Sequence, residues 1–244
     1  MSYSVIGADL GQAADYTAIV VVEPQTLPVI RTDTIYGDRI TRLRPVFRLP
    51  DGTETFKHPP VVYAVPHVAR LNLGTRYTEV VEELKRVRAR VPCSTLAVDA
   101  TGVGRAVIDL IVGAGLSCTA ITITGGDEVT SKGSEYRVPK RDLVGCAQVL
   151  FQNRRLNISR KLPLSEVLFR ELLNFKVKID TRTAHDSYGA WREGVHDDLV
   201  LALCIALWVA ERSSCVPVEI ATGEPDYWDS PPAWDAPRRR EPEW

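Results

Sequence analysis

The sequence predicts an α/β fold, with a mixed central sheet flanked by helices on both faces. Segments typical of strands and of helices alternate over the first 212 residues, which is the pattern of a layered α/β domain. Residues 4–9 and 17–23 are apolar and rich in β-branched side chains, and the short turn between them indicates an antiparallel hairpin. Residues 95–99, 104–112 and 119–124 follow one another as strand, helix and strand, which predicts a parallel βαβ unit.

Hydrophobic periodicity places the remaining elements. We expect a further strand at residues 61–71, helices at 75–90, 139–153 and 164–175, and a short strand at 176–180. Residues 197–211 are apolar on every side, so the helix that they form should be buried. The segment 32–60 is rich in Arg, Pro and Gly, and we expect it to leave the central sheet.

The composition predicts one globular domain followed by a tail. The chain has 244 residues, of which 45% are hydrophobic and 25% charged, as in ordinary globular proteins. Its last part, residues 213–244, holds six prolines, three of the five tryptophans and seven acidic residues, a composition that disfavours a packed core. We therefore expect a domain at residues 1–212 and a flexible C-terminal tail at residues 213–244.

No stretch of the sequence is typical of export or of insertion into a membrane. No apolar run approaches the roughly 18 residues of a membrane span, and the first residues lack the basic and apolar regions of a signal peptide. Five scattered cysteines, with no Cys-x-x-Cys pair, indicate buried, reduced thiols rather than a disulfide framework or a zinc site. We expect a cytoplasmic protein, in the host cytoplasm if the chain is viral, with no membrane partner.

Acidic residues stand at three points where an α/β fold collects reactive groups. Asp9 ends the first strand, Asp99 ends a later strand, and the pair Asp197 and Asp198 begins the buried helix. Because reactive groups gather at the carboxyl ends of strands in an open sheet, Asp9 and Asp99 meet if their strands are neighbours. Asp198 is placed on the side of the helix that faces the sheet by a ridge of small residues at steps of four: Ala202, Ala206 and Ala210.

Such a group of carboxylates predicts a site for divalent cations. Two like charges about 4 Å apart repel by about 4 kcal/mol at an effective dielectric constant near 20, and a bound cation offsets this cost. Oxygen ligands favour Mg²⁺ or Mn²⁺ over zinc, and two such ions can activate a water molecule and stabilise the leaving oxygen of a phosphodiester. Each acid also has a structural alternative, since Asp9 and Asp99 suit turns and Asp197 suits a helix cap.

Three motifs, in their order along the chain, resemble the nuclease domain of phage terminase large subunits, which belongs to the ribonuclease H-like, resolvase-like group. They are Gly-Ala-Asp-Leu-Gly-Gln at residues 7–12 with Asp-Tyr-Thr-Ala at 15–18, Val-Asp-Ala-Thr-Gly-Val-Gly at 98–104, and His-Asp-Asp-Leu-Val-Leu-Ala-Leu at 196–203. The resemblance spans roughly residues 5–212. It implies a ribonuclease H-like sheet and a metal-dependent endonuclease that cuts concatemeric double-stranded DNA during genome packaging.

The resemblance also implies ligands and partners. By matching position, Asp9, Asp99 and one or both of Asp197 and Asp198 are the metal ligands, and the alanine ridge favours Asp198 as the direct one. The chain contains no Gly-x-x-x-x-Gly-Lys-Ser/Thr phosphate loop, so we expect no ATPase motor in it, whether it is an excised domain or a free-standing relative. The expected partners are double-stranded DNA and, by the resemblance, a terminase ATPase subunit, the small terminase subunit and the portal.

Further residues near these motifs suit supporting roles or contacts with DNA. Asp15 can border the active site or only close the turn of the hairpin. His196 can orient water or a DNA phosphate, or it can assist the cap of the last helix. A basic group precedes and begins the helix at residues 139–153, where the terminase family also tends to carry basic residues: Lys132, Arg137, Lys140 and Arg141. A solvated charged surface is the structural alternative for this group.

Other functions fit parts of the sequence. A Holliday-junction resolvase or a transposase would use a related nuclease site. The motif Asp-Leu-Gly-Gln at residues 9–12 also resembles the phosphate-binding hairpin of the actin, sugar-kinase and chaperone ATPase fold. Such proteins need a second phosphate loop and have no evident use for an Asp-Asp pair on the last helix. A non-catalytic docking module is disfavoured because all three acidic positions are filled.

The distribution of charge predicts an effect of the C-terminal tail on DNA binding. The whole chain has a formal charge of -1, but the tail carries three basic and seven acidic residues, and residues 131–192 carry thirteen basic and six acidic residues. Deleting residues 213–244 should therefore tighten binding to duplex DNA at low salt, because it removes acidic charge that competes with DNA phosphates. A salt titration of DNA affinity checks this, and an unchanged or weaker affinity contradicts it.

Overall fold

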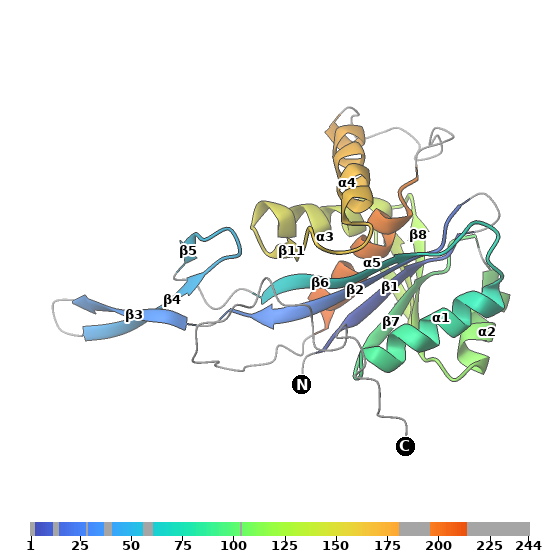
Figure 1. Ribbon diagram of the computed structural model, residues 1–244, viewed down its shortest axis with the longest axis horizontal. Coiled ribbons are helices and arrows are strands. Elements are labelled where there is room, and N and C mark those ends of the chain that lie inside the picture. Colours follow the sequence, from blue (N-terminus) through green and yellow to red (C-terminus); the bar gives the residue numbers. More distant parts are fainter. Residues whose placement is uncertain are drawn as a thin grey trace, which may run out of the picture.

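The computed structural model describes residues 3–11, 15–27, 29–36, 41–55, 61–102, 104–180 and 196–213. In this part of the chain a large sheet carries helices on both faces, and a small second sheet projects from one end of it (Figure 1). Residues 214–244 lie outside the described part, so the flexible tail stays a prediction. No helix in the described ranges combines the length and the apolar character that crossing a membrane requires.

Eight strands form the large sheet, in the order β11-β6-β2-β1-β7-β8-β10-β9. Their bounds are β1 (Val5–Asp9), β2 (Ala18–Thr26), β6 (Val61–Arg70), β7 (Thr95–Asp99), β8 (Cys118–Thr124), β9 (Thr130–Lys132), β10 (Glu135–Pro139) and β11 (Leu156–Ile158). β2 runs antiparallel to β1 and to β6, whereas β1, β7, β8 and β10 are parallel neighbours. The sheet is therefore mixed, and the predicted hairpin and the predicted parallel unit are both confirmed.

Helices cover the two faces of this sheet. Within the described ranges they are α1 (Tyr77–Arg90), α2 (Gly104–Gly113), α3 (Lys140–Gln152), α4 (Ser165–Asp180) and α5 (Asp198–Arg212). α1 and α2 lie on one face, and α3, α4 and α5 lie on the other (Figure 1). Each face has its own apolar core, so side chains along β1 alternate: Val5 packs on the α5 side, and Ile6 and Ala8 pack on the α1 side.

Short segments are where the sequence-based predictions fail. Residues 176–180 continue α4, so the strand predicted there is wrong. Five residues of alternating pattern do not outweigh the extension of α4, because each residue added to an existing helix gains a backbone hydrogen bond without a new nucleation cost. The sequence analysis gives no strand at β9, β10 or β11, because these short segments carry polar or charged residues and form no apolar, β-branched run.

The expected departure from the central sheet is a second sheet of three strands. It consists of β3 (Val29–Tyr36), β4 (Thr41–Arg48) and β5 (Glu54–Thr55), in the order β3-β4-β5. The sheet projects beyond the ends of β2 and β6 (Figure 1). A small core of Leu27, Phe47 and Val62 joins it to the central sheet, and Arg154 forms an ion pair of 2.5 Å with Asp51.

The described cysteines are free thiols: Cys93, Cys118, Cys146 and Cys204. Cys204 is buried in α5, as expected. Cys93 is exposed, so the expectation of burial is wrong there. It lies in the surface turn between α1 and β7, where its φ of 61° is in the left-handed region.

A glycine lets α5 lie directly on β1 at the centre of the sheet. A Cβ atom at Gly7 would collide with the carbonyl oxygen of Ala202 and would lie 2.9 Å from the Cβ atom of Ala206. The alanine ridge predicted from the sequence is therefore the surface of α5 that meets β1. Nearly every residue of α5 from Asp198 to Ala210 is buried, which confirms the prediction of a buried helix.

Gly7→Ala is expected to lower the free energy of unfolding by about 3 kcal/mol, because the Ala202 backbone can yield only if α5 moves. Gly145→Ala is the matched control. Gly145 lies within α3, where a new Cβ atom meets nothing within 4 Å, so this change should stabilise the protein by about 1 kcal/mol. Chemical unfolding of both variants measures the contrast, and equal stabilities would contradict the close packing.

Candidate metal centre

Two neighbouring strands deliver Asp9 and Asp99 to the same edge of the sheet. Each acid is the last residue of its strand, and β1 and β7 are parallel neighbours. Val5 and Ala97 belong to the core on the α5 side, and Asp9 and Asp99 follow them at even spacing. Since side chains alternate along a strand, both acids face the α5 side.

The start of α5 adds Asp197 and Asp198 to this group. Asp198 lies one helical turn before Ala202, whose carbonyl oxygen meets β1 at Gly7. The contact between helix and strand thus places the first turn of α5 near the end of β1. Asp198 is buried, with 4% of its surface exposed.

Burial and neighbouring carboxylates raise the pKa of Asp9. Burial is the main cause that raises its pKa well above the usual value, and the charges of four other acids add to this: Asp99, Asp198, Asp197 and Asp15. Burial also raises the pKa of Asp198, to about 6. For Asp99, burial raises the pKa, while Thr101 opposes the shift and donates a backbone hydrogen bond of 2.7 Å to Oδ1. Five carboxylates therefore act on one site.

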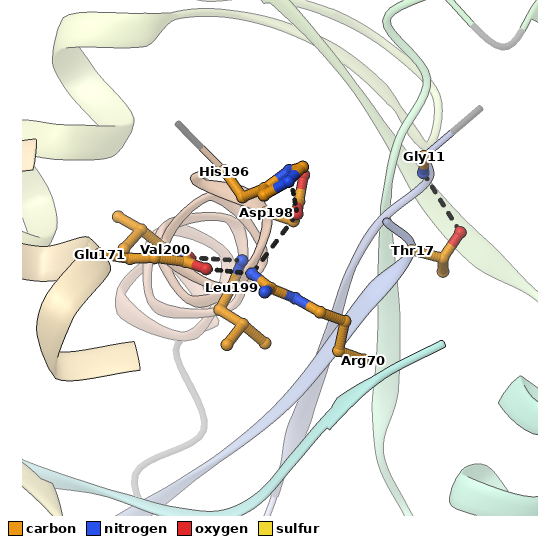
Figure 2. Close-up of polar contacts among 8 residues, drawn as sticks. All are labelled: Gly11, Thr17, Arg70, Glu171, His196, Asp198, Leu199 and Val200. Carbon is orange, nitrogen blue, oxygen red and sulfur yellow. Dashed lines mark hydrogen bonds and ion pairs between the residues drawn. The ribbon is translucent and has the colours of Figure 1, made fainter. Parts of the chain in front are cut away.

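Asp15 and His196 lie beside Asp198. Ligand atoms of these three residues are all within 4.8 Å of one another. The Nδ1 atom of His196 is 3.8 Å from Oδ2 of Asp198 (Figure 2), and the edge of its ring packs on Tyr16 with ring centres 4.8 Å apart. Three predicted ligands, Asp9, Asp99 and Asp197, are not part of this group, although the charges of Asp15 and Asp198 act on Asp9.

Gly11 fixes the backbone that carries Asp15. Its N–H group donates a hydrogen bond of 3.2 Å to Oγ1 of Thr17 (Figure 2). A Cβ atom at Gly11 would collide with the carbonyl oxygen of Asp15, so a larger residue could not pack there. Asp15 lies beside Asp198, so it stands at the border of the acidic group.

Lys140 is the predicted basic residue that reaches the acids. It is the first residue of α3, and its Nζ atom lies 3.9 Å from Oδ2 of Asp197 and 5.8 Å from the ring centre of Phe175. Burial lowers the pKa of Lys140 to about 8, and the charges of Asp197 and Asp9 oppose this shift. A positive charge therefore stands at the edge of the acidic group.

The other predicted basic residues make their described contacts elsewhere. Lys132 and Arg137 are exposed on β9 and β10. Arg141 forms an ion pair of 2.5 Å with Asp127 and also donates a hydrogen bond to the carbonyl oxygen of that residue. These three side chains belong to the surface around the site rather than to the acidic group.

Two residues that the sequence analysis did not select, Arg70 and Glu171, complete the site (Figure 2). Arg70 ends β6, and its guanidinium forms an ion pair with Glu171 and lies 3.4 Å from Oδ2 of Asp198. It also lies over the ring of Tyr16, 4.8 Å from the ring centre. No local pattern marks these two residues, because they come from separate elements and only the tertiary fold brings them to α5.

Glu171 caps α5 from the neighbouring helix α4. Its Oε2 atom accepts hydrogen bonds of 3.1 and 3.3 Å from the backbone N–H groups of Leu199 and Val200. Asp197 occupies the N-cap position, as the cap alternative expects, but its side chain makes no capping hydrogen bond. Burial raises the pKa of Glu171 to about 7, against the opposing charge of Arg70.

The donor set fits a hard divalent cation. Oδ2 of Asp198 is buried and accepts no hydrogen bond from the described residues. A buried carboxylate oxygen without a hydrogen bond is costly unless a cation or another donor satisfies it. Carboxylate oxygens are the ligands that Mg²⁺ and Mn²⁺ prefer, and one imidazole nitrogen is compatible with Mn²⁺.

Comparisons with known proteins find similar solved structures at low sequence identity. No protein-family model matches the chain, and no curated protein matches it in sequence. The chain is similar to the crystal structure of the large terminase nuclease from thermophilic phage G20c, with 19% identity, 84% of this chain and 81% of that chain covered, and a TM-score of 0.49. Another structure of that nuclease has bound cobalt, with 19% identity, 84% and 80% coverage and the same TM-score.

A viral protein of a different origin is also similar. The Mn-soaked human cytomegalovirus terminase nuclease domain has 13% identity, 84% of this chain and 82% of that chain covered, and a TM-score of 0.42. The mixed central sheet with helices on both faces confirms the predicted α/β fold class.

The stability of the metal-free protein should fall as the pH rises from about 4 to about 7. The folded state raises the pKa of Asp198 to about 6 and that of Glu171 to about 7, above the usual values of about 4. The unfolded chain therefore loses these protons first, so their contribution to stability is present at low pH and disappears through pH 7. Melting temperatures measured against pH check this.

Asp198→Asn is the control for this pH dependence. The amide does not titrate, so the fall in melting temperature between these pH values should be smaller in the variant than in the wild type. Identical pH profiles would show that Asp198 is not the titrating group.

Proposed function

We propose that the protein is a metal-dependent nuclease that hydrolyses phosphodiester bonds of double-stranded DNA. The observation that carries this proposal is geometric: Asp9 and Asp99 end paired strands on the face that α5 covers, and the first turn of α5 carries buried Asp198 beside Asp15 and His196. Neighbouring carboxylates repel one another, and Arg70 and Lys140 are described cations that contact them. A bound divalent cation would offset the remaining repulsion between these carboxylates.

The proposed ligands are Asp9, Asp99 and Asp198, with Asp197 beside them. Asp15 and His196 adjoin Asp198 and suit the coordination of a second ion. Mg²⁺ or Mn²⁺ bound there would act as a Lewis acid, which lowers the pKa of a water molecule and neutralises charge on the reacting phosphate. No side-chain nucleophile is required.

The residues of the chain hold the reacting groups in place. Asp9 and Asp99 stand at the ends of paired strands, so the sheet fixes the positions of their carboxylates. Lys140 has a pKa of about 8 and is charged at neutral pH, which allows it to bind a phosphate oxygen beside the acids. Glu171 keeps the first turn of α5 ordered and thereby keeps Asp198 in position.

The charge around the site supports duplex DNA as the substrate. Residues 131–192 carry thirteen basic and six acidic residues, and exposed Lys132 and Arg137 stand on the strands that precede Lys140. Contacts of this kind go to phosphates and do not distinguish base sequences, so cleavage should show little sequence preference.

The motif resemblance supports a finer proposal about the biological role. The cleavage would serve the packaging of concatemeric viral DNA, as in terminases. Residues 1–244 hold no phosphate loop, so this activity would work together with an ATPase motor, a small terminase subunit and a portal.

A plasmid assay tests the nuclease proposal. The protein should convert supercoiled plasmid into nicked and linear forms with Mn²⁺ or Mg²⁺, and EDTA should stop the reaction. Asp9→Asn and Asp99→Asn should each lower the rate by about a hundredfold or more, because each removes a ligand of an ion that contributes several kcal/mol. Asp109→Asn, on the exposed surface of α2, is the matched control and should leave the rate unchanged.

The outcomes separate the alternatives. Intact plasmid with every metal ion, or equal rates for the wild type and Asp9→Asn, would overturn the nuclease proposal. Cleavage of four-way junctions but not of linear duplex would favour a resolvase. A rise in melting temperature with Mg·ATP would favour the ATP-binding alternative.

A further inference from the structure

Arg70 and Glu171 form a shielded ion pair beside Asp198. Their side chains are only 14% and 6% exposed. Arg70 comes from β6, and Glu171 comes from α4, which packs on α5. An ion pair withdrawn from water is strong when both partners are present and costly when one is removed.

Arg70 is shared between two carboxylates. Its Nη2 atom forms the ion pair with Glu171 and also lies 3.4 Å from Oδ2 of Asp198 (Figure 2). That oxygen is buried and accepts no hydrogen bond from the described residues. The guanidinium is thus close enough to neutralise Asp198, but its nearer partner is Glu171.

We propose that Arg70 is a built-in counter-ion of the metal centre, and that Glu171 restrains it from pairing fully with Asp198. The inference rests on the proposed role of Asp198 as a metal ligand. In the metal-free protein the guanidinium offsets the charge of Asp198. A divalent cation that binds Asp198 meets this fixed positive charge, so the Arg70–Glu171 pair sets the affinity of the site for the cation. Both are positioning residues.

The contacts of Glu171 explain how it restrains Arg70. One carboxylate oxygen, Oε2, is held by the N–H groups of Leu199 and Val200, and the other, Oε1, faces Arg70. The backbone of α5 therefore fixes the direction in which Glu171 presents its charge. The ring of Tyr16 supports the guanidinium from another side.

The proposal predicts opposite effects for the two partners. Arg70→Met keeps an aliphatic chain and removes the charge, so Mn²⁺ should bind about tenfold more tightly, because a positive charge about 4 Å from a ligand oxygen is lost. Glu171→Gln keeps a carbonyl oxygen for the N–H groups of α5 but loses the charge that holds the guanidinium. Arg70 then pairs with Asp198, and Mn²⁺ should bind severalfold more weakly.

Mn²⁺ titration of the full chain without DNA measures these affinities, with free Mn²⁺ followed by electron paramagnetic resonance. Arg70→Lys keeps the charge and should stay close to the wild type. In the double variant, the effect of Glu171→Gln should shrink, because the guanidinium through which it acts is gone. Arg170→Met is the matched control: it removes an exposed cation from the same helix as Glu171 and should leave the affinity unchanged.

A pair with a purely structural role would weaken Mn²⁺ binding in both single variants, and this result would overturn the proposal, as would unchanged affinities. If Arg70→Met does not fold, Arg70→Gln takes its place and should likewise bind Mn²⁺ more tightly than the wild type, and an equal or weaker affinity of Arg70→Gln overturns the proposal. Wild-type protein that binds no Mn²⁺ would overturn the metal centre itself and the inference with it. If the wild type binds Mn²⁺ but the two single variants do not change its affinity in opposite directions, only the inference is overturned.

Discussion

At Gly7 the helix α5 rests directly on the central strand β1, and the position of the acidic site follows from this contact. Asp9 lies two residues beyond Gly7 on β1, and Asp198 lies one turn before Ala202 on α5. The approach of Ala202 to Gly7 therefore sets how near the two carboxylates come. A side chain larger than hydrogen at Gly7 would lift the helix and separate the acids, so packing and site geometry depend on the same atoms.

The electrostatic cost of this arrangement is met by neighbours from other elements. Burial and mutual repulsion disfavour the charged forms of Asp9 and Asp198, as their raised pKa values record. Arg70 from β6 and Lys140 from α3 bring positive charge, and Glu171 from α4 satisfies the N–H groups at the start of α5. Cations and a cap from three other elements therefore surround the acids at this edge of the sheet.

Elements with a clear period could be predicted from the sequence, and short or tertiary features could not. The hairpin of β1 and β2, the unit β7-α2-β8 and the buried helix α5 follow from β-branched runs, turn residues and apolar faces. The sequence predicts a strand at residues 176–180 because five residues are too few to distinguish the two-residue period of a strand from the 3.6-residue period of a helix. In the structure these residues extend α4, since a helix that has already formed lengthens without a new nucleation cost. The sequence offers Asp197 as the cap of α5, and Asp197 does hold the N-cap position. The capping hydrogen bonds, however, go to Glu171, which lies far away in the chain.

The sequence by itself determined which residues end the strands and begin the last helix, because periodicity and chain order place Asp9, Asp99 and Asp198 at those points. It also determined that α5 could approach the sheet, since the alanine ridge is local to the helix. Only the tertiary structure decided that Arg70 and Glu171 join the site, and that Asp15 lies beside Asp198. Contacts between elements far apart in the chain depend on how the layers pack, and packing leaves no periodic signal in the residues that it brings together.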